Sequence, residues 1–439
     1  MKSANGTAAV NSGGGVAAPL PPLGLAAVSA FCTGLLAREH IAIVGQFYLA
    51  EMVLPLLAIL LLMFGRARAV LTDRLFIGFA LSGLVSLLGY LLSDLVAGTD
   101  ATRALKGSGR VFILVVSGLS LIVLAAHDRR LPWWFLLGLA VGSMARLVLT
   151  GAALVADWKL GWGHPLQILA LAFGGAGPLL AATASAGLGA VHILLDSRIQ
   201  GVLAVVVAAI LLGRARRGRP GPAAVRQLVL VGTLVLAFLG GAWLLLGATA
   251  DDYGERRTLS NTARFAGLEV GIEAIVASPF IGYGSWTENP EFAEQLRRTI
   301  RERTDFQSRR RSMYSSHDLF RQHSQILQAW VEGGLLGAGF FFFYGYWLVR
   351  TLAQQVTRIR FDRYYAVYLY TTMAGLWHLL MSPFGGQARL DIAVAVAVIY
   401  LVTREAPTAE KEPVGAGTAA ATLPLRLRFR PADDRPARH

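Results

Sequence analysis

Apolar stretches recur along the chain from Pro22 to Val402. Most approach the ~20 residues that an α-helix needs to cross the hydrocarbon core of a bilayer. Hydrophobic residues make up 54% of the chain and charged residues 15%, whereas about a quarter of an ordinary soluble domain is charged. A soluble core of this size could not bury so many apolar stretches. The sequence therefore predicts an all-α polytopic membrane protein.

The charges between these stretches set the expected orientation. The formal net charge is +14, and much of the excess lies in short connecting segments. Positive-inside topology explains this pattern better than a nucleic-acid partner does. Four basic segments should be cytoplasmic, namely Arg66–Arg74, His127–Arg130, Arg214–Arg226 and Arg350–Arg363. Three basic residues then fall outside against the rule, namely Arg103, Lys106 and Arg110.

The number of crossings follows from these charges. The expected spans are Pro22–Ala37, Ile41–Phe64, Leu75–Ala97, Val111–Ala126, Pro132–Ala156, Pro165–Leu195, Ile199–Leu212, Leu228–Ala248, Ile326–Val349, Tyr364–Met381 and Leu390–Val402. The stretch Pro165–Leu195 is long for one span and is interrupted at Gly174–Pro178, so we expect two short spans that turn near Gly177. This gives about twelve transmembrane helices with both termini in the cytoplasm.

The expected organisation has five parts. Residues 1–19 form a disordered N-terminus, 20–249 the first nine transmembrane helices, 250–322 one large periplasmic loop, 323–404 helices ten to twelve, and 405–439 a disordered cytoplasmic tail. The first span ends in Arg38-Glu39-His40 rather than a small-residue cleavage site, so it should be retained. The single Cys32 excludes an intramolecular disulfide, and no Cys/His cluster has the spacing of a metal site. No metal and no cofactor are expected.

The large loop should be partly helical. Ser260-Asn261 can cap a helix over Thr262–Ala277 that stops before Pro279. A second stretch, Glu294–Arg311, begins acidic and becomes strongly basic. The segment from Ala250 to Gln322 holds 11 Arg and 11 Asp/Glu, and a long loop with no net charge crosses the membrane regardless of its arginines.

Three residues at the expected outer face carry charge or accept protons. Arg198 opens a span and is either an interfacial arginine or an anion clamp. Arg264 falls on the first turn of the expected loop helix, where a basic group beside free N–H groups suits a phosphate; a solvated surface arginine is the simpler interpretation. His323 opens another span, where it can act as a base near neutral pH or be an inert interfacial residue.

Further polar candidates surround these three. The glycines of Pro279–Gly284, Gly282 and Gly284, permit close approach of a ligand, although an ordinary turn explains them equally well. Arg146 lies near the middle of its expected span, so it needs a buried partner such as Asp94 or Asp391, or a functional role. Three residues flank the outer turn Ser382-Pro383-Phe384, namely His378, Arg389 and Asp391.

Taken together, these stretches resemble the bacterial O-antigen ligase and polymerase family. The resemblance lies in Ser197-Arg198, in Arg264-Phe265 with Ala277–Gly284, in His323-Ser324 with Leu327-Gln328 and Glu332–Gly337, and more weakly in His378 with Pro383. It covers roughly Ser197–Phe384. Ser324 replaces the usual Asn, and the stretch after Gly284 departs from the family pattern, so Thr287–Gln322 could adapt the site to a particular acceptor.

The resemblance implies an activity and its residues. Family members transfer a glycan from undecaprenyl diphosphate to an acceptor at the periplasmic face of the inner membrane. Their two essential arginines correspond to Arg198 and Arg264, and their essential histidine to His323. The implied function is an O-antigen ligase that acts on lipid A–core in lipopolysaccharide biosynthesis, as a metal-independent inverting glycosyltransferase. Gly282, Gly284, Arg146, His378 and Asp391 complete the expected substrate-binding set.

Two alternatives remain open from the sequence. A polymerase of carrier-linked repeats would use the same donor chemistry with a second carrier-linked glycan as acceptor. The close match over His323–Gly337 and the chain length favour a ligase. A transporter of lipid-linked glycan would suit a mid-span Arg146, but the sequence shows no internal repeat and the polar candidates gather at the outer face.

Overall fold

The computed structural model describes residues 24–42, 45–63, 67–155, 157–175, 177–217, 251–286, 289–303, 323–357 and 361–405. The expected N-terminal and C-terminal tails, the expected span Leu228–Ala248 and most of the basic segment Arg214–Arg226 lie outside these residues. The expected stretch Glu294–Arg311 is described only to residue 303.

The described part of the chain is almost entirely helical. Its first half contains α1 (Leu25–Leu35), a 3-10 turn (Leu36–Arg38), the strands β1 (His40–Ala42) and β2 (Gln46–Tyr48), α2 (Leu49–Met63), a second 3-10 turn (Arg68–Thr72), α3 (Arg74–Ala97), α4 (Ala101–His127) and α5 (Leu131–Leu149). Aspartates begin both long helices, because Asp73 accepts hydrogen bonds from the first amides of α3 and Asp100 from those of α4.

The second half begins with a π-helical turn at Trp158–Trp162. It continues with α6 (Gly163–Gly174), α7 (Pro178–Leu194), α8 (Arg198–Arg217), α10 (Asp251–Ala277), α11 (Pro290–Glu302), α12 (Gln325–Gly337), α13 (Gly339–Thr357), α14 (Tyr365–Met381) and α15 (Gly386–Glu405). The expected break near Gly177 is confirmed, because α6 ends at Gly174 and α7 begins at Pro178.

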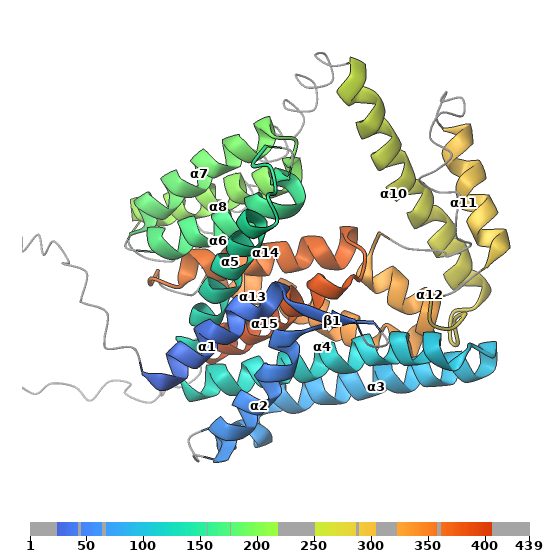
Figure 1. The fold of residues 1–439 in the computed structure, drawn as a ribbon, viewed down its shortest axis with the longest axis horizontal. Coiled ribbons are helices and arrows are strands. Elements are labelled where there is room, and N and C mark those ends of the chain that lie inside the picture. The colour runs from blue at the N-terminus through green and yellow to red at the C-terminus, as the bar shows by residue number, and fades with distance from the viewer. Residues whose placement is uncertain are drawn as a thin grey trace, which may run out of the picture. The chain divides into compact units, whose positions relative to one another are not determined.

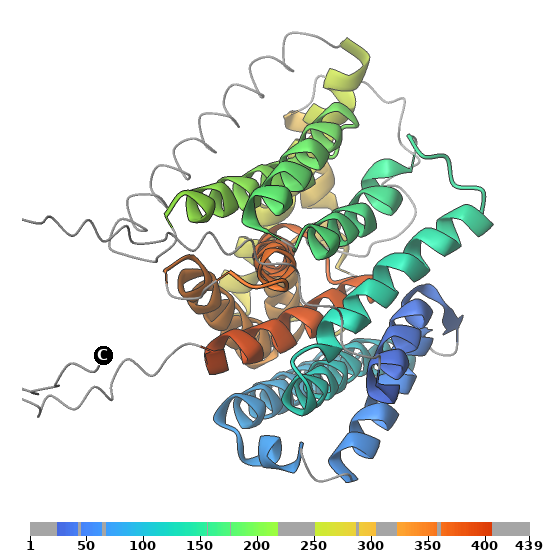
Figure 2. The ribbon, with the colours of Figure 1, turned by 90° about the vertical axis from the view of Figure 1, so that its left-hand side faces the viewer.

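Helices that are distant in the sequence pack side by side (Figures 1 and 2): α1 on α5, α3 on α12 and α4 on α15. Glycines allow the first of these contacts. A Cβ added at Gly34 would lie 2.2 Å from the carbonyl oxygen of Phe135, and one at Gly138 would lie 2.0 Å from that of Phe31. Small residues therefore bring the two backbones together, as they do in membrane bundles.

Length and apolar character identify three described helices that could cross a membrane alone, namely α3, α4 and α5. The helices α12 and α13 pass the same test as a pair, bent by 112°. Several other apolar helices are shorter, including α2 and α7. The chain is thus a helical multi-pass membrane protein, while the count of twelve spans remains a prediction.

Two expected spans are not single helices. The first part of Ile41–Phe64 forms an antiparallel β-hairpin in which Ile41 pairs with Phe47, so this fold is not purely α-helical. The expected span Ile326–Val349 is broken into α12 and α13. Its break follows Gly334, whose φ of 65° is left-handed and favours glycine. Apolar character along a segment does not reveal such breaks, because a bent pair and a straight helix can carry the same side chains.

Two expected helix starts are also wrong. The loop helix α10 begins at Asp251, so Ser260-Asn261 does not cap it and Arg264 does not lie on its first turn. The dipole argument for a phosphate at Arg264 therefore fails. Helix α4 begins at Ala101, so Arg103, Lys106 and Arg110 lie on the helix rather than in a loop.

Candidate functional site

The site is built where α10 packs against α12. Val270, Ala274 and Ile275 of α10 form one buried apolar cluster with Val331 of α12. Beyond the end of α10, the backbone amide of Leu335 donates to the carbonyl of Pro279 over 3.0 Å. The apolar faces of α10 and α12 therefore pack together, and the segment that follows α10 also contacts α12.

The turn Pro279–Gly284 holds α12 through its backbone. The amides of Tyr283 and Gly284 donate to the carbonyls of Val331 and Glu332 over 2.9 and 3.0 Å. A Cβ at Gly282 would lie 2.6 Å from the amide nitrogen of Gly334, and a Cβ at Gly334 would lie 2.1 Å from the carbonyl oxygen of Phe280. Gly282 and Gly334 therefore allow the backbone of the turn Pro279–Gly284 to contact the backbone of α12. Ligand contact at Gly282 and Gly284 remains a prediction.

Side chains of α3 hold the same turn from the other side. Ser93 donates to the carbonyl of Glu332 and accepts from the amide of Gly284 over 2.6 and 2.9 Å. Asp94 accepts from the amide of Ser285 over 2.5 Å and from its hydroxyl over 2.8 Å. Asp94 is thus a partner of the turn rather than of Arg146, which corrects one of the two expected pairings.

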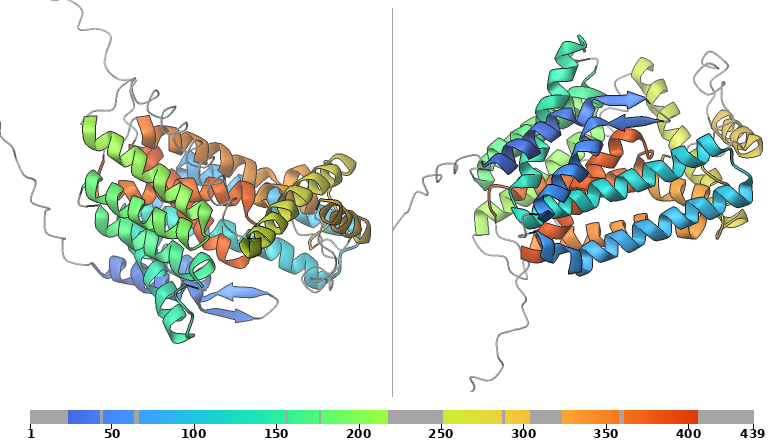
Figure 3. Two further views of the ribbon diagram at one scale, coloured as in Figure 1. Left: turned by 90° about the horizontal axis from the view of Figure 1, so that it is seen from above. Right: turned by 60° about the horizontal axis from the view of Figure 1, so that its bottom comes forward.

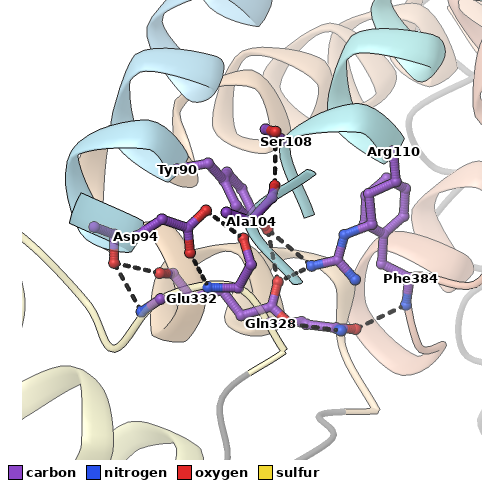
Figure 4. Close-up of polar contacts among 11 residues, drawn as sticks. Tyr90, Asp94, Ala104, Ser108, Arg110, Gln328, Glu332 and Phe384 are labelled. Atoms are coloured by element: carbon purple, nitrogen blue, oxygen red, sulfur yellow. Dashed lines mark hydrogen bonds and ion pairs between the residues drawn. The ribbon is translucent and has the colours of Figure 1, made fainter. Parts of the chain in front are cut away.

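A buried ion pair lies beneath the turn (Figure 4). Arg110 of α4 contacts Glu332 of α12, and the side chains of both are at most 5% exposed. Tyr90 donates to Glu332 over 3.0 Å, and Gln328 joins Glu332 to the amide of Phe384 through bonds of 3.1 and 3.0 Å. The pair therefore ties α3, α4, α12 and the segment before α15 together. Sequence analysis missed this role for Arg110, although a charge in each of two apolar segments was the available signal.

Arg264 and His323 lie close to each other. The Arg264 guanidinium, together with burial, lowers the pKa of His323, which lies in the loop before α12. Burial is the larger cause, because it penalises the charged imidazolium. His323 Nδ1 is buried and has no hydrogen-bond partner among the described residues. Both effects favour the neutral imidazole, the form in which a histidine can accept a proton.

Arg264 differs from the arginines of the neighbouring α11 in its ion pairing. Arg297 lies 2.9 Å from Glu294 and Arg298 lies 2.8 Å from Glu302. Within the described residues no carboxylate contacts Arg264, and its side chain is only half-buried. An unpaired guanidinium beside a neutral imidazole can accept an anionic ligand with bidentate hydrogen bonds.

Arg198 begins α8, and its Nε lies 3.5 Å from Asp196. Asp196 has a left-handed φ of 59°, and the amide of Ser197 donates to the carbonyl of His192 over 2.7 Å. This tight turn orients the start of α8. The convergence of Arg198 with Arg264 and His323 remains a prediction.

The outer end of α14 lies next to the histidine loop. Ser324 donates to the carbonyl of Leu379 over 3.2 Å, and His378 in the preceding turn bonds to the hydroxyl of Ser382 over 2.9 Å. Asp391 of α15 is within electrostatic reach of His378. His378 and Asp391 are therefore neighbours, as expected, while their contact with substrate remains a prediction.

Arg146 has a different setting from the one expected. Helix α5 ends at Leu149, so Arg146 lies in its last turn rather than at mid-span. Its Nη1 bonds to Glu39 over 2.8 Å, and its side chain is 37% exposed. Glu39, rather than Asp94 or Asp391, is its ion-pair partner.

Comparison with known proteins gives one match. Residues 183–342 match the family model described as O-antigen ligase, and no curated protein matches the chain. The matched segment contains Arg198, Arg264 and His323, together with the turn and the start of α13. Over this segment, which is less than half of the chain, the protein is similar to the O-antigen ligase family.

Proposed function

We propose that this protein is an O-antigen ligase of the bacterial inner membrane, which transfers a glycan from undecaprenyl diphosphate to a sugar hydroxyl of lipid A–core in the periplasm. The observation that carries the proposal is Arg264, which has no carboxylate partner among the described residues, beside His323, whose pKa is lowered by burial and by Arg264, within the segment that matches the family. The partner implied at the donor site is a diphosphate, which a guanidinium recognises well.

In the proposed reaction the arginines act on the leaving group. The bond between the anomeric carbon and the diphosphate oxygen breaks, and the electron pair leaves with the diphosphate. Arg264, with Arg198 as its predicted partner, stabilises the negative charge that develops there. Both side chains stay protonated at any physiological pH, so they need no activation.

His323 acts on the acceptor. The acceptor hydroxyl attacks the anomeric carbon from the opposite side, and its proton passes to the free imidazole nitrogen of His323. One C–O bond forms as another breaks, so the anomeric configuration inverts. No metal takes part in this sequence, because the arginines supply the positive charge.

The pH dependence of the rate tests the Arg264–His323 pair. Because the pKa of His323 is lowered, the base stays active below the ordinary histidine value of about 6.5, and activity falls only in more acidic buffer. Arg264→Gln removes one of the two causes that lower the pKa of His323. The acid limb of the pH–rate profile should therefore move toward higher pH. The maximal rate should also fall by about 10²–10³-fold.

The measurement is the initial ligation rate between pH 4.5 and 8.5. Arg298→Gln removes an exposed, paired arginine of α11 and serves as the matched control. An acid limb at the same pH in Arg264→Gln and in the unmodified protein would contradict the electrostatic coupling.

The acceptor separates a ligase from a polymerase. Purified protein is given undecaprenyl-diphosphate glycan together with either lipid A–core or a second carrier-linked glycan, and the products are separated on a gel. We expect lipid A–core to become longer, with no growth of the carrier-linked glycan. Growth of the carrier-linked glycan alone would identify a polymerase and overturn the proposal.

A further inference from the structure

A polar pocket whose lining includes neither Arg264 nor His323 lies beside α5. It has a volume of about 220 Å³, and its lining includes Arg38, His40, Tyr48, Ser143, Arg146 and Thr150. Drug-sized ligands occupy about 300–1,000 Å³, so this pocket suits one sugar ring or one phosphate group. In the predicted topology Arg38 and His40 lie at the outer side, between the first two expected spans.

Two guanidinium groups line the pocket, and no carboxylate does. Arg38 uses its Nε to bond the buried hydroxyl of Ser143 over 2.9 Å. No contact with its terminal nitrogens is seen among the described residues. Glu39 bonds Arg146, and Asp391 is within electrostatic reach of Arg38, but neither acid lines the pocket. The terminal nitrogens of Arg38 and the donors of Arg146 that Glu39 does not use can therefore bind an anion.

The helices place the two arginines together. A Cβ at Gly142 of α5 would lie 2.4 Å from the carbonyl oxygen of Leu35, so α1 and α5 touch just before the 3-10 turn that carries Arg38. Ser143 follows Gly142 and bonds Arg38, and Arg146 lies one turn further along α5. The spacing of the two arginines is thus set by backbone contact between helices rather than by flexible loops.

The β-hairpin forms another wall, and a buried ion pair holds it. Figure 3 shows the two strands beside α1. Strands of three residues would be marginal alone, but Arg389 of α15 donates to the carbonyl of Gln46 over 2.6 Å and to both oxygens of Glu51 over 2.6 and 2.8 Å. Glu51 also accepts from the amide of Tyr48 over 3.0 Å. A bidentate pair that is at most 7% exposed therefore fixes the hairpin against the pocket.

We infer that the Arg38–Arg146 pocket binds an acidic sugar, one that carries a phosphate or carboxylate, on the acceptor glycan. The arginines hold the anion, and the hydroxyls of Ser143 and Thr150 with the side chain of Gln46 supply hydrogen bonds for sugar hydroxyls. This inference rests on the proposed function for the identity of the acceptor. The pocket is a docking site for the acceptor, and it takes no part in bond breaking.

Kinetics with matched acceptors test the inference. Acceptor KM and kcat are measured with a phosphorylated acceptor glycan and with the same glycan after enzymatic removal of its phosphates. The double variant Arg38→Gln/Arg146→Gln should raise the KM for the phosphorylated acceptor by about 10- to 100-fold, because it removes charged hydrogen bonds. Three quantities should change less than about 3-fold, which is well below the expected rise in KM for the phosphorylated acceptor. They are kcat, the donor KM and the KM for the dephosphorylated acceptor.

Direct binding separates this inference from the proposed function. The free phosphorylated oligosaccharide is titrated into the protein in nanodiscs, with inorganic phosphate as competitor. Arginine-dependent binding without any ligation would support the pocket and refute the ligase. Ligation with equal KM in the variant and the unmodified protein would refute the pocket and leave the ligase standing.

Three further outcomes would overturn the inference. An equal rise in KM for the phosphorylated and the dephosphorylated acceptor would show a structural role. Arg38→Lys keeps the positive charge without the fork geometry of arginine, so a folded Arg38→Lys protein should retain part of the preference for the phosphorylated acceptor. A loss in kcat alone would place the arginines at the reacting centre. Displacement of the oligosaccharide by phosphatidylglycerol in the nanodisc would identify a site for lipid headgroups instead.

Discussion

His323→Ala is expected to abolish glycan transfer while the protein still binds the donor lipid. Removal of a positioned general base costs about 10²–10⁴-fold in rate. Arg264 is untouched in this variant, so the diphosphate keeps its guanidinium partner. The measurements are the single-turnover ligation rate and the equilibrium binding of radiolabelled undecaprenyl-diphosphate glycan.

A histidine outside the site provides the control. His127 ends α4, in a segment that the charge pattern places in the cytoplasm, so His127→Ala should transfer at the normal rate. Ligation by His323→Ala at a rate near that of the unmodified protein would rule out the general-base role. Loss of donor binding in His323→Ala would instead assign His323 to holding the diphosphate.

Glu332→Ala is expected to destabilise the protein more than any surface change. It leaves the buried Arg110 without its carboxylate and removes the acceptor of Tyr90 and Gln328. Breaking a buried ion pair from one side costs about 3–5 kcal/mol, because an uncompensated charge stays in the interior. Thermal unfolding in detergent should show a clear loss, and ligation should fall because the turn Pro279–Gly284 is held by the backbone of the same segment.

A double variant distinguishes the effect of the lost charge pairing from the effect of the lost side-chain volume. Arg110→Met/Glu332→Leu removes both charges and keeps apolar volume, and such replacements are often neutral. It should therefore recover much of the stability lost in Glu332→Ala. Glu294→Ala removes an exposed carboxylate of α11 and should leave the unfolding temperature unchanged. Equal unfolding temperatures for Glu332→Ala and Glu294→Ala would contradict the role of the ion pair.

The sequence predicts the class of fold because apolar length is a local property. The helices α3 and α14 begin and end within one residue of the bounds expected for these two segments. The break near Gly177 was also predictable, since consecutive glycines followed by proline interrupt any helix. Each of these features depends on neighbouring residues alone.

Features that depend on tertiary contact were not predictable in this way. The hairpin at His40–Tyr48 is apolar enough to be taken for helix, and it is fixed by Arg389, far away in the chain. The bend after Gly334 depends on the docking of the turn Pro279–Gly284. No residue near either feature signals the distant partner.

The sequence marks Arg264 and His323 as candidates, but the physical reason it gives for Arg264 is wrong. Arg264 was considered for its place at a helix start, which proved wrong, because α10 begins at Asp251. Its actual distinction is the lack of a carboxylate partner among the described residues, together with its closeness to His323. Arg110 appeared only as an exception to the charge rule, whereas the structure gives it a buried partner.

Cross-linking tests the central claim most directly, that Arg264 and His323 share one site open to the periplasm. Cys32 is the only cysteine, so Cys32→Ser provides a background in which Arg264→Cys and His323→Cys are combined. A short bifunctional thiol reagent that cannot cross the membrane is added to spheroplasts, and the linked peptides are identified by mass spectrometry. The account predicts a rapid cross-link between positions 264 and 323. Labelling of either cysteine alone without a cross-link, or labelling only after the membrane is opened, would contradict it.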